Sequence, residues 1–415
     1  MKRRSLLLST TALTGLTAAR GAAPAEPPVL ADSVPMVEKL VASPPALLAP
    51  SQSSVTIVWA VNALCLGRVT IGEMNADGTE GPALINSQQP TDFGFQTSGE
   101  TVLKVVVAGL KLNVTYWYAT VTEALEPPLK GKVETSEKFR FHLPGDNQKE
   151  LSFVVWNDTH DAAPTLKKLH QQTRERKPDF MLWNGDISNN LDRQAQLTPL
   201  YLAPAGGLPF AAETVCYHSR GNHDVRGLRA PLLSNYLAFP GDKPYFSFRL
   251  GPLAAIVLDT GEDKPDNHPF FKGMAAFQPL REEQAAWLKE EINKPHLKDA
   301  PFRVVFCHIP LRWTNEKQVA ESGPNGYDWV SLRSRALWHD SLVAWGTQVV
   351  ISGHTHAWTY LEPAANFPYA QLIGGGPKAA EGILIHAKVT KETLAITLTD
   401  LQDKVVKELE FKPVD

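Results

Sequence analysis

Residues 151–186 read LSFVVWNDTHDAAPTLKKLHQQTRERKPDFMLWNGD, and this stretch decides the fold of the longer part of the chain. Leu151–Trp156 is a continuous apolar run of the kind that forms a buried strand, and Asp179–Trp183 contains a second one. Between them, Pro164–Arg176 has apolar side chains at helical spacing among basic residues. A strand, a helix and a strand in this order predict a parallel βαβ unit and therefore an α/β domain.

The same alternation continues towards the C-terminus. Further buried strands are expected at Leu253–Leu258, Phe302–Cys307 and Gln348–Ile351. Helices are expected at Arg281–Ile292 and Leu332–Trp345, and the chain becomes rich in strands after Ile351. We therefore expect residues 149–415 to form a layered α/β domain with a late antiparallel portion.

Residues 44–145 have a different rhythm. Short alternating strands separated by turn residues are expected at Ser54–Trp59, Arg68–Ile71 and Thr101–Val107. Because almost no helical periodicity occurs there, we expect an all-β sandwich of about 100 residues. The run from Gly109 to Tyr118 resembles the tyrosine-corner region of fibronectin type III domains, in which a Tyr hydroxyl bonds to nearby backbone. Simple alternation of core and surface aromatics is the alternative explanation for residues 116–118.

Residues 1–23 predict an export signal peptide. The chain starts with Met1-Lys-Arg-Arg, an apolar run continues to about Leu16, and small residues follow. A membrane anchor is the weaker alternative, because the run is shorter than the roughly 20 residues that cross a bilayer. Arg3-Arg4 also resembles a twin-arginine signal. Residues 24–43 contain four prolines and are predicted to form a linker. From the signal peptide we expect an exported protein that is periplasmic or secreted.

The composition is that of an ordinary folded protein. Its 415 residues allow two or three domains, and 43% of them are hydrophobic. With 41 basic and 44 acidic residues the net charge is −3, so no patch that binds nucleic acid is expected. No segment after the signal is apolar enough to span a membrane. Cys65, Cys216 and Cys307 form no CxxC pair, which excludes a zinc–thiolate site and allows one disulfide at most. The oligomeric state has no sequence indicator.

Polar residues with metal-binding chemistry follow the predicted buried strands. They form five motifs: Asp158-Thr-His160, Gly185-Asp186, Gly221-Asn222-His223-Asp224, His308 and Gly353-His354-Thr-His356. Because the carboxyl ends of strands in an open α/β sheet border a crevice, we expect these motifs to meet there. Oxygen and imidazole donors without a thiolate suit Zn²⁺, Mn²⁺ or Fe. Any one motif could be structural, but five in order at strand ends favour a metal site.

This series of motifs resembles the calcineurin-like metallophosphoesterase family, whose pattern is D-x-H, GD, GNH-D/E, a lone H and GH-x-H. The resemblance implies a two-sheet α/β sandwich with two divalent metal ions, Mn, Zn or Fe. It also implies hydrolysis of phosphomonoesters or phosphodiesters by direct attack of a hydroxide that bridges the metals. The implied ligands are Asp158, His160 and His356 for one ion, Asn222, His308 and His354 for the other, and Asp186 as the bridge.

His223 and Asp224 are the candidate catalytic residues. The resemblance implies that His223 stabilises or protonates the leaving oxygen and that Asp224 orients it. Chemistry supports these roles, because an imidazole can donate a proton near neutral pH and a carboxylate fixes its tautomer and raises its pKa. Arg226 is the candidate substrate-binding residue, since its guanidinium could contact a phosphate oxygen; a solvated loop arginine is the alternative.

A β-sandwich ahead of such a domain also resembles purple acid phosphatases, with two departures. Those enzymes have Tyr three residues after the bridging Asp, where Asn189 stands here, and their first motif lacks the His found at His160. Because the missing tyrosinate gives those enzymes their colour, we expect a colourless enzyme. A phosphate ester is the expected substrate. The alternative function is a non-catalytic envelope binding or adhesion protein that uses the β-sandwich.

Overall fold

The structure is a computed structural model, and it describes residues 37–87, 94–321, 323 and 328–414. The predicted signal peptide, residues 1–23, and most of the predicted linker lie outside the described residues. The folded part begins before the predicted domain start at residue 44. Leu40 is buried, and the main-chain N–H groups of Leu40 and Val41 donate hydrogen bonds of 2.9 and 3.1 Å to the carboxylate of Glu134.

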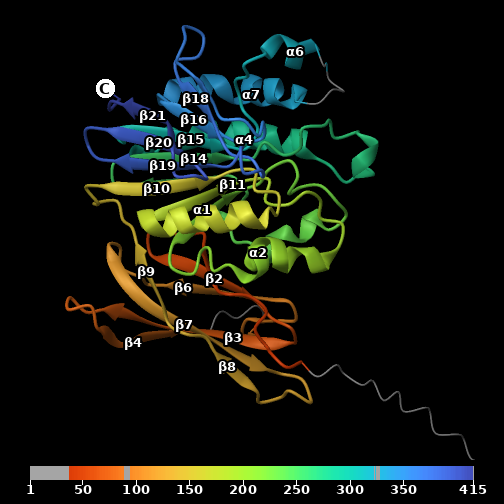
Figure 1. Cartoon of the computed structure of the whole chain (residues 1–415), viewed down its shortest axis with the longest axis vertical. Helices are drawn as coiled ribbons and strands as arrows, with labels where there is room; N and C mark the ends of the chain where they lie inside the picture. Colours follow the sequence, from red (N-terminus) through yellow and green to blue (C-terminus); the bar gives the residue numbers. More distant parts are fainter. Residues whose placement is uncertain (1–36, 88–93, 322, 324–327, 415) are drawn as a thin grey trace, which may run out of the picture. The chain divides into compact units, whose positions relative to one another are not determined.

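Two large sheets organise the α/β part of the chain (Figure 1). The first sheet contains, in order, β21 (Val405–Phe411), β20 (Leu394–Asp400), β19 (Ile383–Val389), β10 (Leu151–Trp156), β11 (Phe180–Asn184), β12 (Val215–Ser219), β1 (Ala46–Leu48), β2 (Ser54–Ala60) and β6 (Val102–Ala108). The second sheet contains β13 (Phe246–Leu250), β14 (Leu253–Leu258), β15 (Phe302–Cys307), β16 (Val349–Ser352), β18 (Ala370–Ile373) and β17 (Thr359–Leu361). Strands β10 to β12 are parallel to one another, as are β14, β15, β16 and β18.

These two sheets pack face to face with helices on their outer sides. Phe153 of the first sheet meets Phe306 of the second edge-on, with 5.8 Å between ring centroids. Helix α1 (Ala163–Arg176) packs on the outer face of the first sheet, and α4 (Phe277–Glu291) and α7 (Trp329–Trp345) pack on the outer face of the second. The predicted two-sheet α/β sandwich is confirmed, and the three predicted helices are present.

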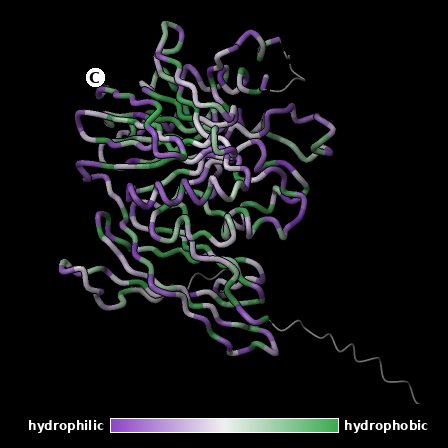
Figure 2. The backbone as a smooth tube through the Cα atoms, in the orientation of Figure 1, coloured by the Kyte–Doolittle hydropathy of each residue, from purple (hydrophilic) through white to green (hydrophobic). Residues whose placement is uncertain are grey.

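Hydrophobicity follows these layers. Figure 2 shows hydrophobic residues concentrated along the strands of the α/β part and hydrophilic ones mainly in the loops. Short helices fill the connections: α2 (Pro204–Gly207), α3 (Leu233–Tyr236), α5 (Pro295–Lys298) and α6 (Glu316–Glu321).

The three cysteines are buried and free, so the one disulfide that the sequence allowed does not form. Among the described residues, no helix has the length and apolar character needed to cross a bilayer.

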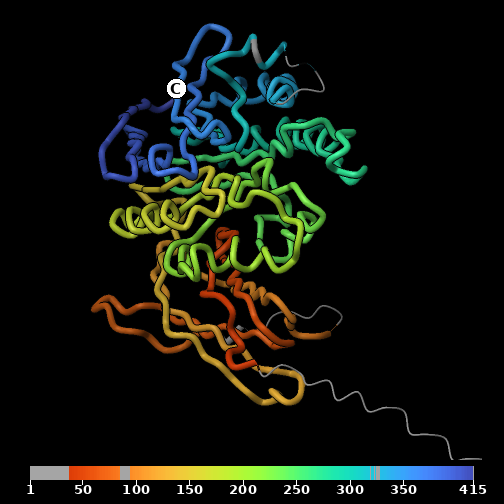
Figure 3. Tube along the Cα trace, turned by 45° about the vertical axis from the view of Figure 1, so that its right-hand side comes forward, coloured from red at the N-terminus to blue at the C-terminus, as the bar shows by residue number. Residues whose placement is uncertain are grey.

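The late antiparallel portion completes the first sheet. Strand β19 pairs antiparallel with β10, which places Ala387 opposite Phe153, and β20 and β21 continue outwards from it. Figure 3 shows this adjacency, with the blue C-terminal strands next to the yellow strand β10.

A third sheet belongs to the N-terminal part of the chain. It contains β4 (Glu80–Ser87), β3 (Cys65–Met74), β7 (Val114–Ala124) and β8 (Val133–Thr135), with β5 (Ser98–Gly99) beside β3 and β9 (Phe139–Leu143) beside β7. It packs against β2 and β6, and Trp59 of β2 donates a 2.9 Å hydrogen bond from Nε1 to Oγ1 of Thr122 in β7. Two β layers are therefore present in this part, as the sequence predicted.

One of these β layers is continuous with the α/β domain. Strand β1 pairs in parallel with β12, with Leu48 opposite Cys216. This pairing covers the edge of β12, whose main-chain N–H and C=O groups would otherwise lack strand partners. The predicted boundary near residue 145 therefore does not separate two sets of sheets.

The aromatic residues at 116–118 each have a specific partner. The Tyr116 hydroxyl accepts a 2.7 Å hydrogen bond from the N–H of Lys111, which is the backbone contact expected of a tyrosine corner. Trp117 donates to the carbonyl of Gly81 at 3.0 Å, and Tyr118 donates to the carbonyl of Ala212 at 2.8 Å. The fibronectin type III likeness of the whole layer stays a prediction.

Candidate metal centre

All the motif residues lie just beyond the carboxyl ends of parallel strands. They follow β10 (Asp158 and His160), β11 (Asp186), β12 (Asn222, His223 and Asp224), β15 (His308) and β16 (His354 and His356). Because the strands of both sheets end at the same edge of the sandwich, the five motifs meet there, as the strand pattern predicted.

Several of these residues have an unusual backbone conformation. The φ angles are 50° at Asp158, 43° at His160, 50° at Asp186, 74° at His354 and 56° at His356. A left-handed conformation is uncommon for residues with a Cβ atom and persists where the surrounding structure enforces it. Such positions cluster at functional sites, and here they are the predicted metal ligands.

Two glycines of the motifs lie so close to ligand carboxylates that no other residue fits there. A Cβ atom on Gly221 would lie 2.2 Å from Oδ1 of Asp186, and one on Gly353 would lie 2.2 Å from Oδ2 of Asp158. Both distances are impossible for real atoms, so any side chain would displace a predicted metal ligand. The glycines of the GNHD and GHTH motifs thus leave room for the two carboxylates.

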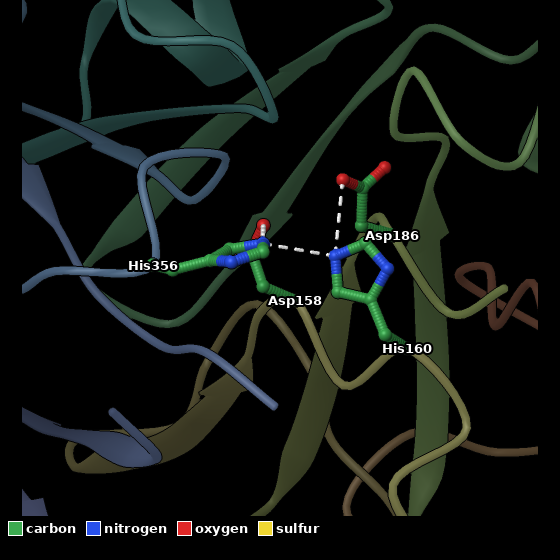
Figure 4. Close-up of side chains that lie close together, drawn as sticks. All are labelled: Asp158, His160, Asp186 and His356. Atoms are coloured by element: carbon green, nitrogen blue, oxygen red, sulfur yellow. Dashed lines mark hydrogen bonds and ion pairs between the residues drawn. The ribbon is translucent and has the colours of Figure 1, made fainter. Parts of the chain in front are cut away.

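The first cluster consists of Asp158, His160, Asp186 and His356, whose potential ligand atoms all lie within 4.8 Å of one another (Figure 4). Nε2 of His160 lies 3.5 Å from Oδ2 of Asp186 and 2.9 Å from Nε2 of His356. Nε2 of His356 in turn lies 3.6 Å from Oδ1 of Asp158. Two imidazoles and two carboxylates therefore converge on one point.

The protonation of His160 fits a bound cation. Its Nδ1 donates to Oδ1 of Asn189 at 3.1 Å, so Nε2 has a free lone pair that faces Nε2 of His356. Burial lowers the pKa of His160 to about 4, which keeps the ring neutral at physiological pH. A neutral imidazole beside two carboxylates is a good ligand set for Zn²⁺, Mn²⁺ or Fe²⁺.

The second cluster consists of Asp186, His308 and His354. Nδ1 of His308 donates to the carbonyl of Asn184 at 2.8 Å, and its buried Nε2, 3.1 Å from Oδ2 of Asp186, has no hydrogen-bond partner among the described residues. Burial alone would lower the pKa of His308, but the carboxylates of Asp186 and Asp158 raise it to about 10. Positive charge is therefore stabilised at this position, which a metal ion would supply.

Asn222 completes the second cluster. Nε2 of His354 donates to Oδ1 of Asp328 at 2.6 Å, so its Nδ1 is an acceptor. This Nδ1 lies 2.8 Å from Oδ1 of Asn222, a second acceptor, while Nδ2 of Asn222 donates to Asp263 at 3.3 Å. Two acceptors that face each other repel unless a cation lies between them.

Asp186 is the common member of both clusters. It is 1% exposed, and its Oδ2 atom approaches His160 from one cluster and His308 from the other. All seven predicted ligands therefore lie together, and the carboxylate predicted to bridge two metal ions is the one that the clusters share.

The calcineurin-like phosphoesterase family model matches residues 151–358 of this chain. The chain belongs to this family. Its relatives include the serine/threonine-protein phosphatase CPPED1 of Homo sapiens, 28% identical over 206 residues, which are 48% of this chain and 58% of that protein. Purple acid phosphatase 1 of Ipomoea batatas is 22% identical over 304 residues, 62% of this chain and 56% of that protein. The chain thus spans a little over half the length of these relatives.

A solved structure supports the fold. The purple acid phosphatase PPD1 from seeds of yellow lupin (Lupinus luteus) superposes with a TM-score of 0.63 at 13% sequence identity. The match covers 89% of this chain and 74% of that chain. At this identity the likeness shows a shared fold and does not transfer residue roles.

In this calcineurin-like phosphoesterase, Asp224 does not have the predicted role. Its buried carboxylate accepts hydrogen bonds from the N–H groups of Ile187, Ser188 and Gly221 and from the Tyr201 hydroxyl, at 2.6 to 3.1 Å. These bonds fasten the loop after β11 to the loop after β12. Asp224 is therefore a positioning residue for the loops and does not orient the His223 ring.

The ring of His223 is held by other groups. Its Nδ1 donates to the carbonyl of Asn189 at 2.7 Å, and Nη1 of Arg226 donates to its Nε2 at 2.8 Å. The predicted rise in the pKa of His223 is wrong. Burial lowers this pKa, Arg226 lowers it further, and Asp186 offsets only part of the effect.

Arg226 is anchored in an acidic pair. Its Nε and Nη2 atoms donate to the two carboxylate oxygens of Glu262 at 2.7 Å each, and Nη2 also donates to Asp263 at 2.9 Å. The alternative of a solvated loop arginine is wrong, because Arg226 is buried. The remaining guanidinium nitrogen, Nη1, faces the ring of His223. A contact between Arg226 and a substrate phosphate stays a prediction.

Four acidic or amide side chains outside the five motifs hold residues of the site. Glu262 and Asp263 hold Arg226, Asp328 holds His354, and Asn189 holds both His160 and His223. The acidic run near residue 262 and the position of Asn189 after Asp186 are visible signals for a cleft rim and for a ligand-orienting group, so of these four it was Asp328 that sequence reasoning missed. Asp328 had none, because it reaches His354 from a distant loop.

Proposed function

We propose that this chain is a metal-dependent phosphoesterase that hydrolyses phosphate esters with two divalent metal ions, Mn, Zn or Fe. The observation that carries this proposal is the buried Asp186 carboxylate, which belongs to both ligand clusters. Family membership supports the same chemistry. When bound, such ions polarise phosphoryl oxygens and lower the pKa of water.

The residues of the chain have separable roles in this proposal. One ion would be held by Asp158, His160 and His356. The other ion would be held by Asn222, His308 and His354, and the carboxylate of Asp186 would bind both ions. His223 is not part of either cluster, and its ring is partly accessible beside them. It can exchange a proton with the leaving oxygen at Nε2, where it now accepts from Arg226.

The test is hydrolysis by metal-stripped protein reloaded with Mn²⁺, Zn²⁺ or Fe²⁺. The substrates are 4-nitrophenyl phosphate and bis(4-nitrophenyl) phosphate, which separate monoesterase from diesterase activity. Metal-dependent release of nitrophenol is expected from at least one of them. If the reloaded protein binds no metal and releases no nitrophenol, the proposal fails and the non-catalytic adhesion alternative gains support.

We also propose that the protein is exported to the periplasm or secreted. The support is the sequence of residues 1–23, with its basic start and short apolar run. Fractionation of cells that express the full chain tests this, with Arg3→Lys/Arg4→Lys to detect the twin-arginine route. Retention of the wild-type chain in the cytoplasm would contradict export.

A further inference from the structure

A cavity of about 720 Å³ lies between the loop after β12 and the segment before α4. Its volume is typical of small-molecule sites in proteins. Three nonpolar side chains of its lining are unusually exposed: Leu228 at 56%, Phe270 at 45% and Met274 at 52%. Neither the metal ligands nor the proton-transfer candidate His223 line it, so it is a separate feature from the metal centre.

The cavity nevertheless lies near the metal centre. Arg220 and Val225 both line it, and they flank the turn that contains Asn222 and His223. Each of these two lining residues is two positions from one of those site residues, which is at most about 8 Å along the chain. Asp192, from the loop that also holds Asn189, lines the same cavity. A molecule bound at the metals could therefore extend into it.

The side chains that line the cavity determine which kind of ligand it can bind. Four of its side chains carry charge, namely Asp192, Arg220, Lys272 and Glu283, and every other lining residue is nonpolar. Two positive and two negative charges balance, and Arg220 and Glu283 are already paired with Asp259 and Lys243. No lining residue is a hydroxyl or amide side chain, and the nonpolar lining residues outnumber the four charged ones, which favours an apolar group over a sugar or a nucleoside.

We propose that this cavity binds an uncharged, apolar alcohol portion of the phosphoester substrate. The inference rests on the proposed function, because it places the phosphate at the metal centre and the organic group of the ester in the cavity. Burial of methylene groups against Leu228, Phe270 and Met274 would favour esters of longer apolar alcohols.

A matched pair of substrates tests this proposal on the full, metal-reloaded chain. Ethyl phosphate and hexyl phosphate have leaving groups of nearly equal basicity and differ in apolar length. We expect kcat/KM for hexyl phosphate to exceed that for ethyl phosphate by at least about tenfold, because four more methylene groups leave water. Equal values for the two esters would overturn the inference and leave the proposed function standing.

Two exposed residues allow a variant that does not threaten the fold. In Leu228→Ser/Phe270→Ser, the ratio of kcat/KM for hexyl phosphate to kcat/KM for ethyl phosphate should fall to about threefold or less. The matched control is Leu84→Ser, because Leu84 is also 56% exposed but lies on β4. A hexyl preference that survives the double substitution would place the apolar group elsewhere and overturn the inference.

A binding measurement separates this inference from the proposed function. Hexylphosphonate and ethylphosphonate keep a phosphate-like head group but cannot be hydrolysed at an ester bond. Tighter calorimetric binding of hexylphosphonate, reduced by the double substitution, supports the cavity assignment even if no ester is hydrolysed; in that case only the proposed function fails. Equal affinity for the two phosphonates would overturn the cavity assignment.

Discussion

The main-chain N–H of His223 donates a 2.8 Å hydrogen bond to Oδ1 of Asp186, the carboxylate that both ligand clusters share. The proton-transfer candidate is thus tied to the metal centre through its backbone, while its ring stays outside the clusters. A substitution of the side chain leaves this backbone contact available. Metal binding and proton transfer can therefore be separated by mutation.

His223→Ala should lower kcat by roughly 10²- to 10⁴-fold, the usual effect of removing a general acid or base. The metal content of the variant should equal that of the wild type, because the ring belongs to neither cluster. Steady-state kinetics with elemental analysis of the same sample checks both statements, with His296→Ala as the control at an exposed position. Loss of metal from the His223 variant would identify it as a ligand.

Asp224→Asn should lower the free energy of unfolding by about 1–3 kcal/mol. The buried carboxylate accepts hydrogen bonds at both oxygens, and an amide would turn an N–H₂ group towards one of those donors. Urea unfolding monitored by tryptophan fluorescence measures the change. A variant of wild-type stability that had lost activity would instead return Asp224 to the role of orienting His223.

Arg226→Met should destabilise the chain by about 3–5 kcal/mol, because it leaves the carboxylates of Glu262 and Asp263 buried without their main partner. The comparison is Arg68→Met, which breaks the more exposed ion pair with Glu123 and should cost about 1 kcal/mol or less. Urea unfolding of both variants gives the two values. Similar costs at the two positions would show that the Arg226 cluster contributes little to folding.

Burial of His218 should make the folding stability of the chain fall at acidic pH. It is fully buried on β12, and burial lowers its pKa to about 3. Because the unfolded chain binds the proton near pH 6.5, stability is fully present above that pH and is lost as the pH falls towards 3. This one group should contribute a loss of about 2–3 kcal/mol between pH 6.5 and 4.5.

The variant His218→Phe removes that titration. The ring packs against both Trp183 and Phe210, and its Nε2 atom has no partner among the described residues, so phenylalanine suits the position. The stability difference between pH 6.5 and 4.5 should be smaller in the variant by the stated amount. An unchanged pH dependence would show that His218 does not control it.

The α/β sandwich and the ligand set could be predicted because they depend on local patterns. Apolar runs mark β10 and β15, and the residue directly after such a run is brought to the shared edge by the parallel arrangement. Asp158, His308 and His354 were found in this way. The pairing of β1 with β12 could not be predicted, because it depends on which sheet edge is free in the folded domain.

The electrostatic surroundings of the site were less accessible to sequence reasoning. A carboxylate next to His223 in sequence suggested that Asp224 orients the ring, yet it turns to the loop backbone, and the carbonyl of Asn189 holds the ring. The burial of Arg226 and its pairing with Glu262 depend on a loop 36 residues away. Such contacts are set by tertiary packing, which neither spacing nor composition encodes.

The most direct test of the central claim is the metal content of the wild-type chain and of Asp186→Asn, measured by elemental analysis after reloading with Mn²⁺ or Zn²⁺. Asp340→Asn, a change at an exposed position of α7, is the matched control. We predict about two ions per chain in the wild type and the control, and almost none in Asp186→Asn, because both ions share this carboxylate. Two ions retained by Asp186→Asn would contradict the account.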